Sequence, residues 1–126
     1  MSVVVDTSAW IEWLIGSETG DRLAAQWPTR DETIVPTLVQ LELAKWLRRE
    51  VSEEAMDQAL AYLEQCRIVP LDTRIALHAA ELCSLHKLAT ADAIVYATTI
   101  EGRARLLTCD AHFKGLEGVI HVAKGG

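Results

Sequence analysis

The chain of 126 residues has little of what marks secreted, disulfide-rich or membrane proteins. It contains only three cysteines, Cys66, Cys83 and Cys109, and their odd number and wide spacing indicate reduced thiols and not a disulfide framework or a zinc site. No run approaches the roughly 18 uninterrupted apolar residues that a membrane helix needs. The N-terminus lacks a basic region followed by a cleavage site. We therefore expect a cytoplasmic protein with no membrane association.

Glycine, proline and positive charge are also scarce. The 7 glycines and 3 prolines form no linker between two domains, so we expect a single domain over residues 1–126, with a loose end at 123–126. The net charge of −6 argues against a protein that coats nucleic acid through a basic surface. A nuclease is not excluded, because acids of its active site would contribute to this charge. Its polyanionic substrate would then need a metal ion and a local basic patch.

Short β-branched or apolar runs alternate with helical patterns along the chain. Strands are expected at residues 3–5, 33–35, 67–71, 105–108 and 119–122. Helices are expected at residues 9–15, 21–27, 37–50, 53–65, 73–85 and 90–102, with a turn or short helix at 111–113. This alternation predicts an α/β fold of three layers, in which helices flank a mainly parallel central sheet.

Four acids occupy positions that such a fold would aim at one point. Asp6 follows the first strand, Asp110 follows the fourth, Asp92 lies in the first turn of a helix, and Glu42 lies within another helix. Ligands of open parallel sheets bind at the carboxyl ends of the strands. Carboxylates gathered there repel one another by about 3 kcal/mol per pair at ~5 Å and an effective dielectric of ~20. Protons or a cation must neutralise them, and an oxygen-rich set without cysteine favours a hard divalent cation.

Each acid also has an ordinary structural explanation. Asp6 could cap the first helix, and Asp92 could offset a helix dipole, an effect of about 0.3–1 kcal/mol. Asp110 could be a turn residue. Their coincidence at strand-to-helix switch positions favours a functional site.

The explanation for Glu42 depends on which way its helix faces. Lys45 and Arg49 lie on the same helical stripe, so Glu42 and Lys45 could form an ordinary solvated ion pair. If this stripe faces the cleft instead, Glu42 reaches the metal and the two cations lie near phosphates.

Four segments together resemble the motifs of PIN-domain ribonucleases, specifically the VapC toxins of toxin–antitoxin pairs. Val4 to Ala9, with the sequence VVDTSA, resembles the opening motif. The segments Pro36 to Glu42, Thr90 to Ala93 and Leu106 to Phe113 resemble the motifs that carry the other three acids. The resemblance extends from Val3 to about Val119, whereas the stretch from Ser52 to Leu88 carries no motif.

The resemblance implies hydrolysis of RNA phosphodiester bonds with Mg²⁺ or Mn²⁺, and it implies catalytic roles for Asp6, Glu42, Asp92 and Asp110. Asp6, Asp92 and Asp110 would mainly hold the metal, directly or through water, and Glu42 would ligate it or orient the attacking water. Hydrogen bonds from neighbouring hydroxyls would support the acids, with three candidates: Thr7, Ser8 and Thr108. A homodimer and a small antitoxin as partner are implied as well.

The histidines and tryptophans allow two interpretations each. His78, His86, His112 and His121 lack metal-ligand spacing, and His112, the nearest to the acids, is a candidate RNA contact beside Lys45 and Arg49. Trp10, Trp13 and Trp27 are expected mainly in the core. The alternative is an exposed groove for the antitoxin, which predicts at least one exposed indole.

Two rival functions remain at this point. A receiver-type signalling domain has a similar length and binds Mg²⁺, but it needs paired acids after the first strand and a late strand-end lysine. Here Thr7 and Ser8 follow Asp6, and Asp110 stands near the late strand end. The second rival is a catalytically inactive binding module of the PIN fold, and the retention of all four acids argues against it. A dinucleotide-binding module is excluded because no glycine-rich turn follows the first strand.

Overall fold

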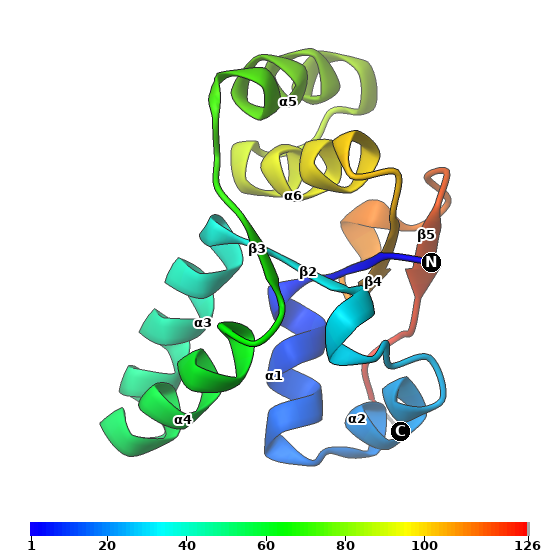
Figure 1. Cartoon of the computed structure of the whole chain (residues 1–126). Coiled ribbons are helices and arrows are strands. Elements are labelled where there is room, and N and C mark those ends of the chain that lie inside the picture. Colours follow the sequence, from blue (N-terminus) through cyan, green and yellow to red (C-terminus); the bar gives the residue numbers. More distant parts are fainter. Residues whose placement is uncertain (126) are drawn as a thin grey trace.

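The computed structural model of the chain describes residues 1–125 (Figure 1). The described part contains five strands: β1 (Val3–Val5), β2 (Thr33–Pro36), β3 (Arg67–Val69), β4 (Arg105–Thr108) and β5 (Val119–His121). It also contains six α-helices: α1 (Thr7–Ile15), α2 (Glu18–Ala24), α3 (Thr37–Glu50), α4 (Glu53–Leu63), α5 (Thr73–His86) and α6 (Thr90–Glu101). Two short 3-10 helices, η1 (Arg30–Glu32) and η2 (Ala111–Phe113), complete the order.

The five strands form one sheet in the order β3-β2-β1-β4-β5, and every pair of neighbours is parallel. This confirms the α/β prediction. The sheet was expected to be mainly parallel, and all of its described strand pairs are parallel. β1 and β4 lie side by side in the middle, with Val5 opposite Leu107. Because the strands run the same way, the residues that follow β1 and β4 emerge at the same edge of the sheet.

Helices cover both faces of the sheet. α5 packs on α6 above the sheet in Figure 1, whereas α1 and α2 lie below it and the α3–α4 pair stands beside α1. The central strands are consequently buried on both sides: Val4, Val5, Leu106 and Leu107 have no exposed surface. Continuous apolar runs are typical of parallel strands covered by helices on both faces.

The second helix differs from its prediction, because α2 begins and ends three residues earlier than expected. The Ser17 hydroxyl accepts a hydrogen bond from the Gly20 backbone N–H at 2.9 Å and caps the helix. A Cβ atom at Gly20 would lie 2.3 Å from the backbone oxygen of Glu12, so glycine permits the close approach of α2 to α1. Trp27 therefore lies beyond α2, although the sequence pattern predicts it inside this helix.

The C-terminal segment lies against α2. One nitrogen of Arg22, Nη2, donates to the backbone oxygens of Ala123 and Gly125 at 2.6 and 2.7 Å, and Gly125 N–H donates to Thr19 Oγ1 at 3.1 Å. Residues 123–125, which belong to the end expected to be loose, thus take part in three hydrogen bonds. Gly126 lies outside the described residues. Within residues 1–125, no helix is long and apolar enough to span a membrane.

Candidate active site

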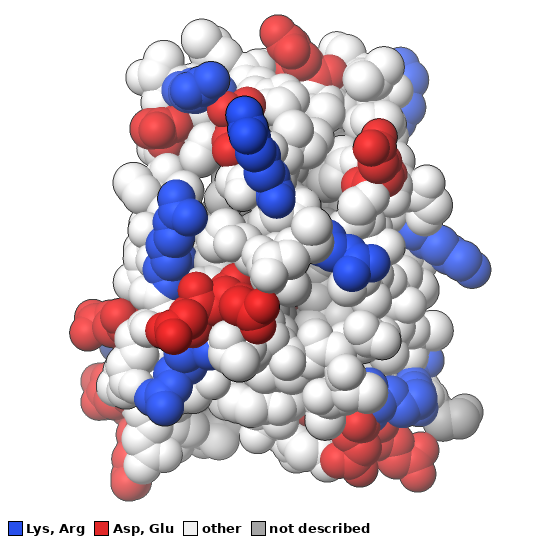
Figure 2. Space-filling model, turned by 45° about the vertical axis from the view of Figure 1, so that its right-hand side comes forward, with Lys and Arg blue, Asp and Glu red and all other residues white. Residues whose placement is uncertain are grey.

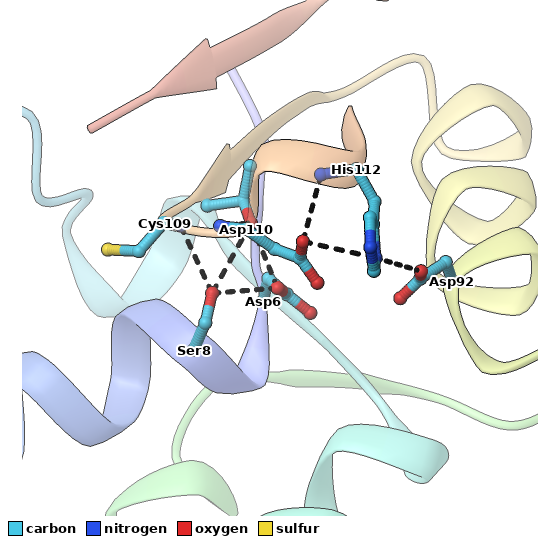
Figure 3. A network of polar contacts seen from close by, with 7 residues as sticks. Asp6, Ser8, Asp92, Cys109, Asp110 and His112 are labelled. Carbon is cyan, nitrogen blue, oxygen red and sulfur yellow. Dashed lines mark hydrogen bonds and ion pairs between the residues drawn. The ribbon is translucent and has the colours of Figure 1, made fainter. Parts of the chain in front are cut away.

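Asp6 is held from two sides at the carboxyl end of β1 (Figure 3). It is only 7% exposed. The hydroxyls of Ser8 and Thr108 both donate to its Oδ2 atom, at 2.8 and 2.9 Å. Oδ1 receives no side-chain hydrogen bond within residues 1–125, so one oxygen of this carboxylate is oriented by the protein and the other is left for a ligand.

The two hydroxyls are themselves oriented by the backbone that follows β4. Cys109 N–H donates to Ser8 Oγ at 3.0 Å, and Asp110 N–H donates to Thr108 Oγ1 at 2.9 Å. Each hydroxyl oxygen therefore accepts from the backbone and directs its own hydrogen toward Asp6. Such support fixes the orientation of a carboxylate before a ligand binds.

The structure does not support the interpretation of Asp6 as a helix cap. Its backbone stands at the N-cap of α1, but its side chain makes no capping hydrogen bond. Burial raises the pKa of Asp6, and the charge of Glu42 acts in the same direction, whereas the hydrogen bonds from Ser8 and Thr108 lower it. A buried carboxylate of this kind is costly to ionise unless a positive charge lies beside it.

Asp92 and Asp110 face each other across the same edge, with His112 between them (Figure 3). His112 Nδ1 lies 3.2 Å from Asp92 Oδ2 and 3.3 Å from Asp110 Oδ1. The pKa of Asp92 is raised, first by burial and then by the negative charges of Asp110 and Asp6, and the contact with His112 lowers it in part. The charges of three acids thus converge on one region. Asp110 also fulfils the turn role considered for it, since its side chain accepts from His112 N–H at 2.9 Å and caps η2.

Glu42 is directed toward this region by the start of α1. Thr7 Oγ1 donates to Glu42 Oε1 at 2.8 Å, and Glu42 forms no ion pair with Lys45 in the described part of the chain. Lys45 and Arg49 are exposed, and Arg49 pairs with Glu50 at 3.1 Å. In the described part of the chain, Glu42 is therefore not paired with either cation of its helical stripe.

Three of the four tryptophans, Trp10, Trp13 and Trp27, form one aromatic cluster. Trp10 is 1% exposed and lies edge-on to Trp13 and Trp27, so it belongs to the core and cannot form the surface of a partner site. Trp13 stacks on Trp27 at 4.4 Å, and both are partly exposed. Trp13 also borders an apolar groove of about 540 Å³ between α1 and the α3–α4 pair. The groove is lined by Trp13, Leu14, Ile15, Leu47, Val51, Ala55, Gln58, Ala59 and Tyr62.

The donor set at the sheet edge fits a divalent cation. One potential ligand atom from each of Asp92, Asp110 and His112 lies within 4.8 Å of the others. From the sequence, Asp6, Asp92 and Asp110 are the expected metal ligands and His112 is a candidate RNA contact, whereas the structure also places His112 between Asp92 and Asp110. The spacing of Asp110 and His112 could have indicated this position. In a 3-10 turn that begins with a capping Asp, the residue two positions later lies close to that carboxylate.

Charge on the visible face of the molecule is mixed. Figure 2 shows Lys and Arg side chains interspersed with Asp and Glu, with no continuous basic surface on that face. Together with the net charge of −6, this makes a positive ion at the acid cluster important for any contact with a polyanion.

Solved structures of low sequence identity share this fold. A toxin–antitoxin complex from Klebsiella pneumoniae contains a chain that is 23% identical, with a TM-score of 0.83 and coverage of 98% of this chain and 100% of that one. VapC20 from Mycobacterium tuberculosis, described as a toxin that cleaves the Sarcin–Ricin loop, is 22% identical, with a TM-score of 0.78 and coverage of 98% and 100%. DNA-bound VapBC from Salmonella typhimurium matches at 14% identity, with a TM-score of 0.74 and coverage of 98% and 99%.

No curated protein matches the chain by sequence. The model of the PIN domain family, in contrast, matches residues 3–119 and so includes all four acids and the strands β1 to β4, ending at the first residue of β5. The receiver-type alternative is thereby removed. The chain belongs to the PIN domain family.

Proposed function

We propose that the chain is a divalent-metal-dependent endoribonuclease that acts as the toxin of a toxin–antitoxin pair. The observation that carries this proposal is the convergence of buried Asp6 with Asp92 and Asp110 at one edge of the sheet, where burial and the charges of Asp110 and Asp6 raise the pKa of Asp92. The cleavage of the Sarcin–Ricin loop by the M. tuberculosis neighbour supports RNA as the substrate class.

Asp6, Asp92 and Asp110 would hold Mg²⁺ or Mn²⁺, which when bound polarises a phosphoryl oxygen and lowers the pKa of a water molecule. Ser8 and Thr108 keep Asp6 in one orientation through their bonds to Oδ2. Glu42, held by the Thr7 hydroxyl, would orient the attacking water for in-line approach to the phosphorus. The burial of Asp6 excludes bulk water from its side of the site and strengthens electrostatic interactions there.

RNA would approach over the exposed outer side of the site. Lys45 and Arg49 lie on the same exposed side of α3 and would contact phosphates, while His112 stands at the solvent-facing rim of the acids.

A homodimer would extend this path. Leu77 and Leu85 of α5 are 65% and 71% exposed, which supports an additional subunit contact. Sedimentation at micromolar concentration tests this, since a clean monomer contradicts it.

Metal dependence tests the nuclease proposal. Cleavage of a structured RNA by the purified chain should stop with a chelator and return with Mg²⁺ or Mn²⁺, and Ca²⁺ alone should not restore it. Full activity in the chelator, or stoichiometric zinc bound through cysteine, would sink the mechanism.

The apolar groove is where we place the antitoxin. Its walls combine the Trp13 indole with aliphatic side chains of α1, α3 and α4, which suits an amphipathic segment of a partner protein. The Klebsiella neighbour is itself part of a toxin–antitoxin complex, which supports a partner of this class. An arginine of that partner could also pair with the acid cluster in bidentate geometry.

Growth and fluorescence test the toxin role. Expression of the chain alone should arrest growth, and Asp6→Asn or co-expression of the adjacent small gene should relieve the arrest. Partner binding should shift tryptophan emission and weaken with Trp13→Ala but not with Ile100→Ala, a change at an exposed apolar residue outside the groove. Harmless expression of the folded wild-type chain would defeat the toxin role and leave the nuclease role standing.

A further inference from the structure

His112 stands in the acid cluster although it is an exposed residue. Its side chain is 72% exposed, yet Nδ1 lies 3.2 Å from Asp92 Oδ2 and 3.3 Å from Asp110 Oδ1 (Figure 3). One potential ligand atom from each of the three residues falls within 4.8 Å of the other two. A nitrogen therefore occupies the same small space as two carboxylate oxygens.

The backbone after β4 holds this nitrogen near the acids. Asp110 Oδ1 accepts from His112 N–H at 2.9 Å, so the residue that supplies a carboxylate also fixes the start of η2. Phe113, the next residue, has no exposed surface and anchors the other end of the turn in the core. His112 is thus carried by a short, doubly anchored segment, and its imidazole projects back over Asp92 and Asp110.

The chemistry of imidazole differs from that of the surrounding oxygens. A neutral imidazole offers one nitrogen lone pair. Without a cation, Nδ1 carries the proton that it donates to the carboxylates; with a cation between them, the proton would reside on Nε2 and the Nδ1 lone pair would face the ion. Mg²⁺ selects oxygen ligands, whereas imidazole nitrogen suits transition-metal ions. Adding one nitrogen to two carboxylates therefore changes which divalent cation the site prefers.

We propose that His112 is a nitrogen ligand of the divalent cation and that it shifts the preference of the site from Mg²⁺ toward Mn²⁺. This inference rests on the proposed metal-dependent function and adds a ligand and a selectivity to it. An exposed ion pair of His112 with the two acids is the simpler explanation of the same distances. Such a pair makes a small contribution to stability and gives no nitrogen on the metal.

Pulsed EPR of Mn²⁺ bound to the full chain, without RNA, separates the two explanations. The wild-type chain should show ¹⁴N hyperfine coupling to Mn²⁺, and His112→Ala should lose this coupling. Its Mn²⁺ affinity should fall at least about 10-fold, with Mg²⁺ affinity nearly unchanged. His112→Asp should restore binding without the coupling and reverse the preference toward Mg²⁺. His86→Ala is the matched control, because His86 borders the same hollow beside Asp92 and His112.

Each other outcome has a defined meaning. Mn²⁺ bound to the wild-type chain without ¹⁴N coupling, or coupling that persists in His112→Ala, overturns the role of His112 and leaves the nuclease proposal intact. Failure of the wild-type chain to bind Mn²⁺ or Mg²⁺, together with RNA cleavage in a chelator, overturns both. Circular dichroism should show the same fold for the wild-type chain and for each variant.

Discussion

Asp6 and Asp92 reach the same site in different ways. Asp6 is buried at the end of a central strand, and Ser8 and Thr108 bind one of its oxygens. Asp92 lies on the first turn of α6, is partly exposed, and is contacted by the exposed side chain of His112. Burial is the first cause of the raised pKa of both acids. The charges of neighbouring acids raise the pKa of Asp92 further, whereas hydrogen bonds from hydroxyls lower the pKa of Asp6 in part. The scaffold thus fixes one acid and leaves the other adjustable.

The largest expected effect comes from removing the charge of either acid. Asp6→Asn and Asp92→Asn should each reduce RNA cleavage by at least about 100-fold, because each removes a proposed metal ligand. Both variants should remain folded, since Asn keeps the shape of the side chain and can still accept the hydroxyl hydrogen bonds at position 6. Cleavage assays with thermal unfolding check this, and an unfolded variant would instead reveal a structural cap.

A smaller effect should follow from removing the hydroxyls that hold Asp6. Ser8→Ala and Thr108→Val each delete one donor to Oδ2, and we expect Mn²⁺ affinity to fall by about 10- to 100-fold. Thr108→Ser keeps the hydroxyl and should retain most of the affinity. Unchanged Mn²⁺ affinity in both deletions would place Asp6 outside the metal site and end the comparison with Asp92.

The pH dependence of stability distinguishes the two acids without any metal. Because the pKa of Asp6 in the folded chain is raised above its ordinary value of 3.8, the folded state holds this proton at pH values where the unfolded state has lost it. Stability from this group therefore falls as pH rises from 3.8 through the raised pKa. The melting temperature of Asp6→Asn minus that of the wild type should grow over this range, and less so for partly exposed Asp92→Asn. A difference that shrinks with pH would contradict the sign.

The smallest effect is expected outside the acid cluster, at Arg49. If it contacts a phosphate, Arg49→Ala should raise KM for RNA modestly and reduce the slope of log affinity against log salt by about 1. Arg49→Lys keeps the charge and should preserve the slope. An unchanged slope in Arg49→Ala would leave only its surface pair with Glu50.

Local sequence is sufficient for the strands and for the positions of the acids. Short β-branched runs and helical spacing place β1, β4 and α6 nearly at their observed bounds, and parallel strands bring Asp6 and Asp110 to one edge. Local pattern is insufficient for α2. Its position depends on the close approach of Gly20 to the backbone of Glu12, which is a contact between two helices and not a propensity.

The gathering of acids at the carboxyl ends of parallel strands follows from the order of residues along the chain, because side chains that follow adjacent parallel strands leave the sheet at the same edge. The hydrogen bonds that hold each acid, in contrast, depend on contacts between distant segments. Thr108 reaches Asp6 across 102 positions, and Thr7 reaches Glu42 across 35, through the register of β1 with β4 and the packing of α1 beside α3. The place of His112 between Asp92 and Asp110 depends likewise on how η2 and α6 meet in space, since hydrogen bonds join atoms that folding brings together.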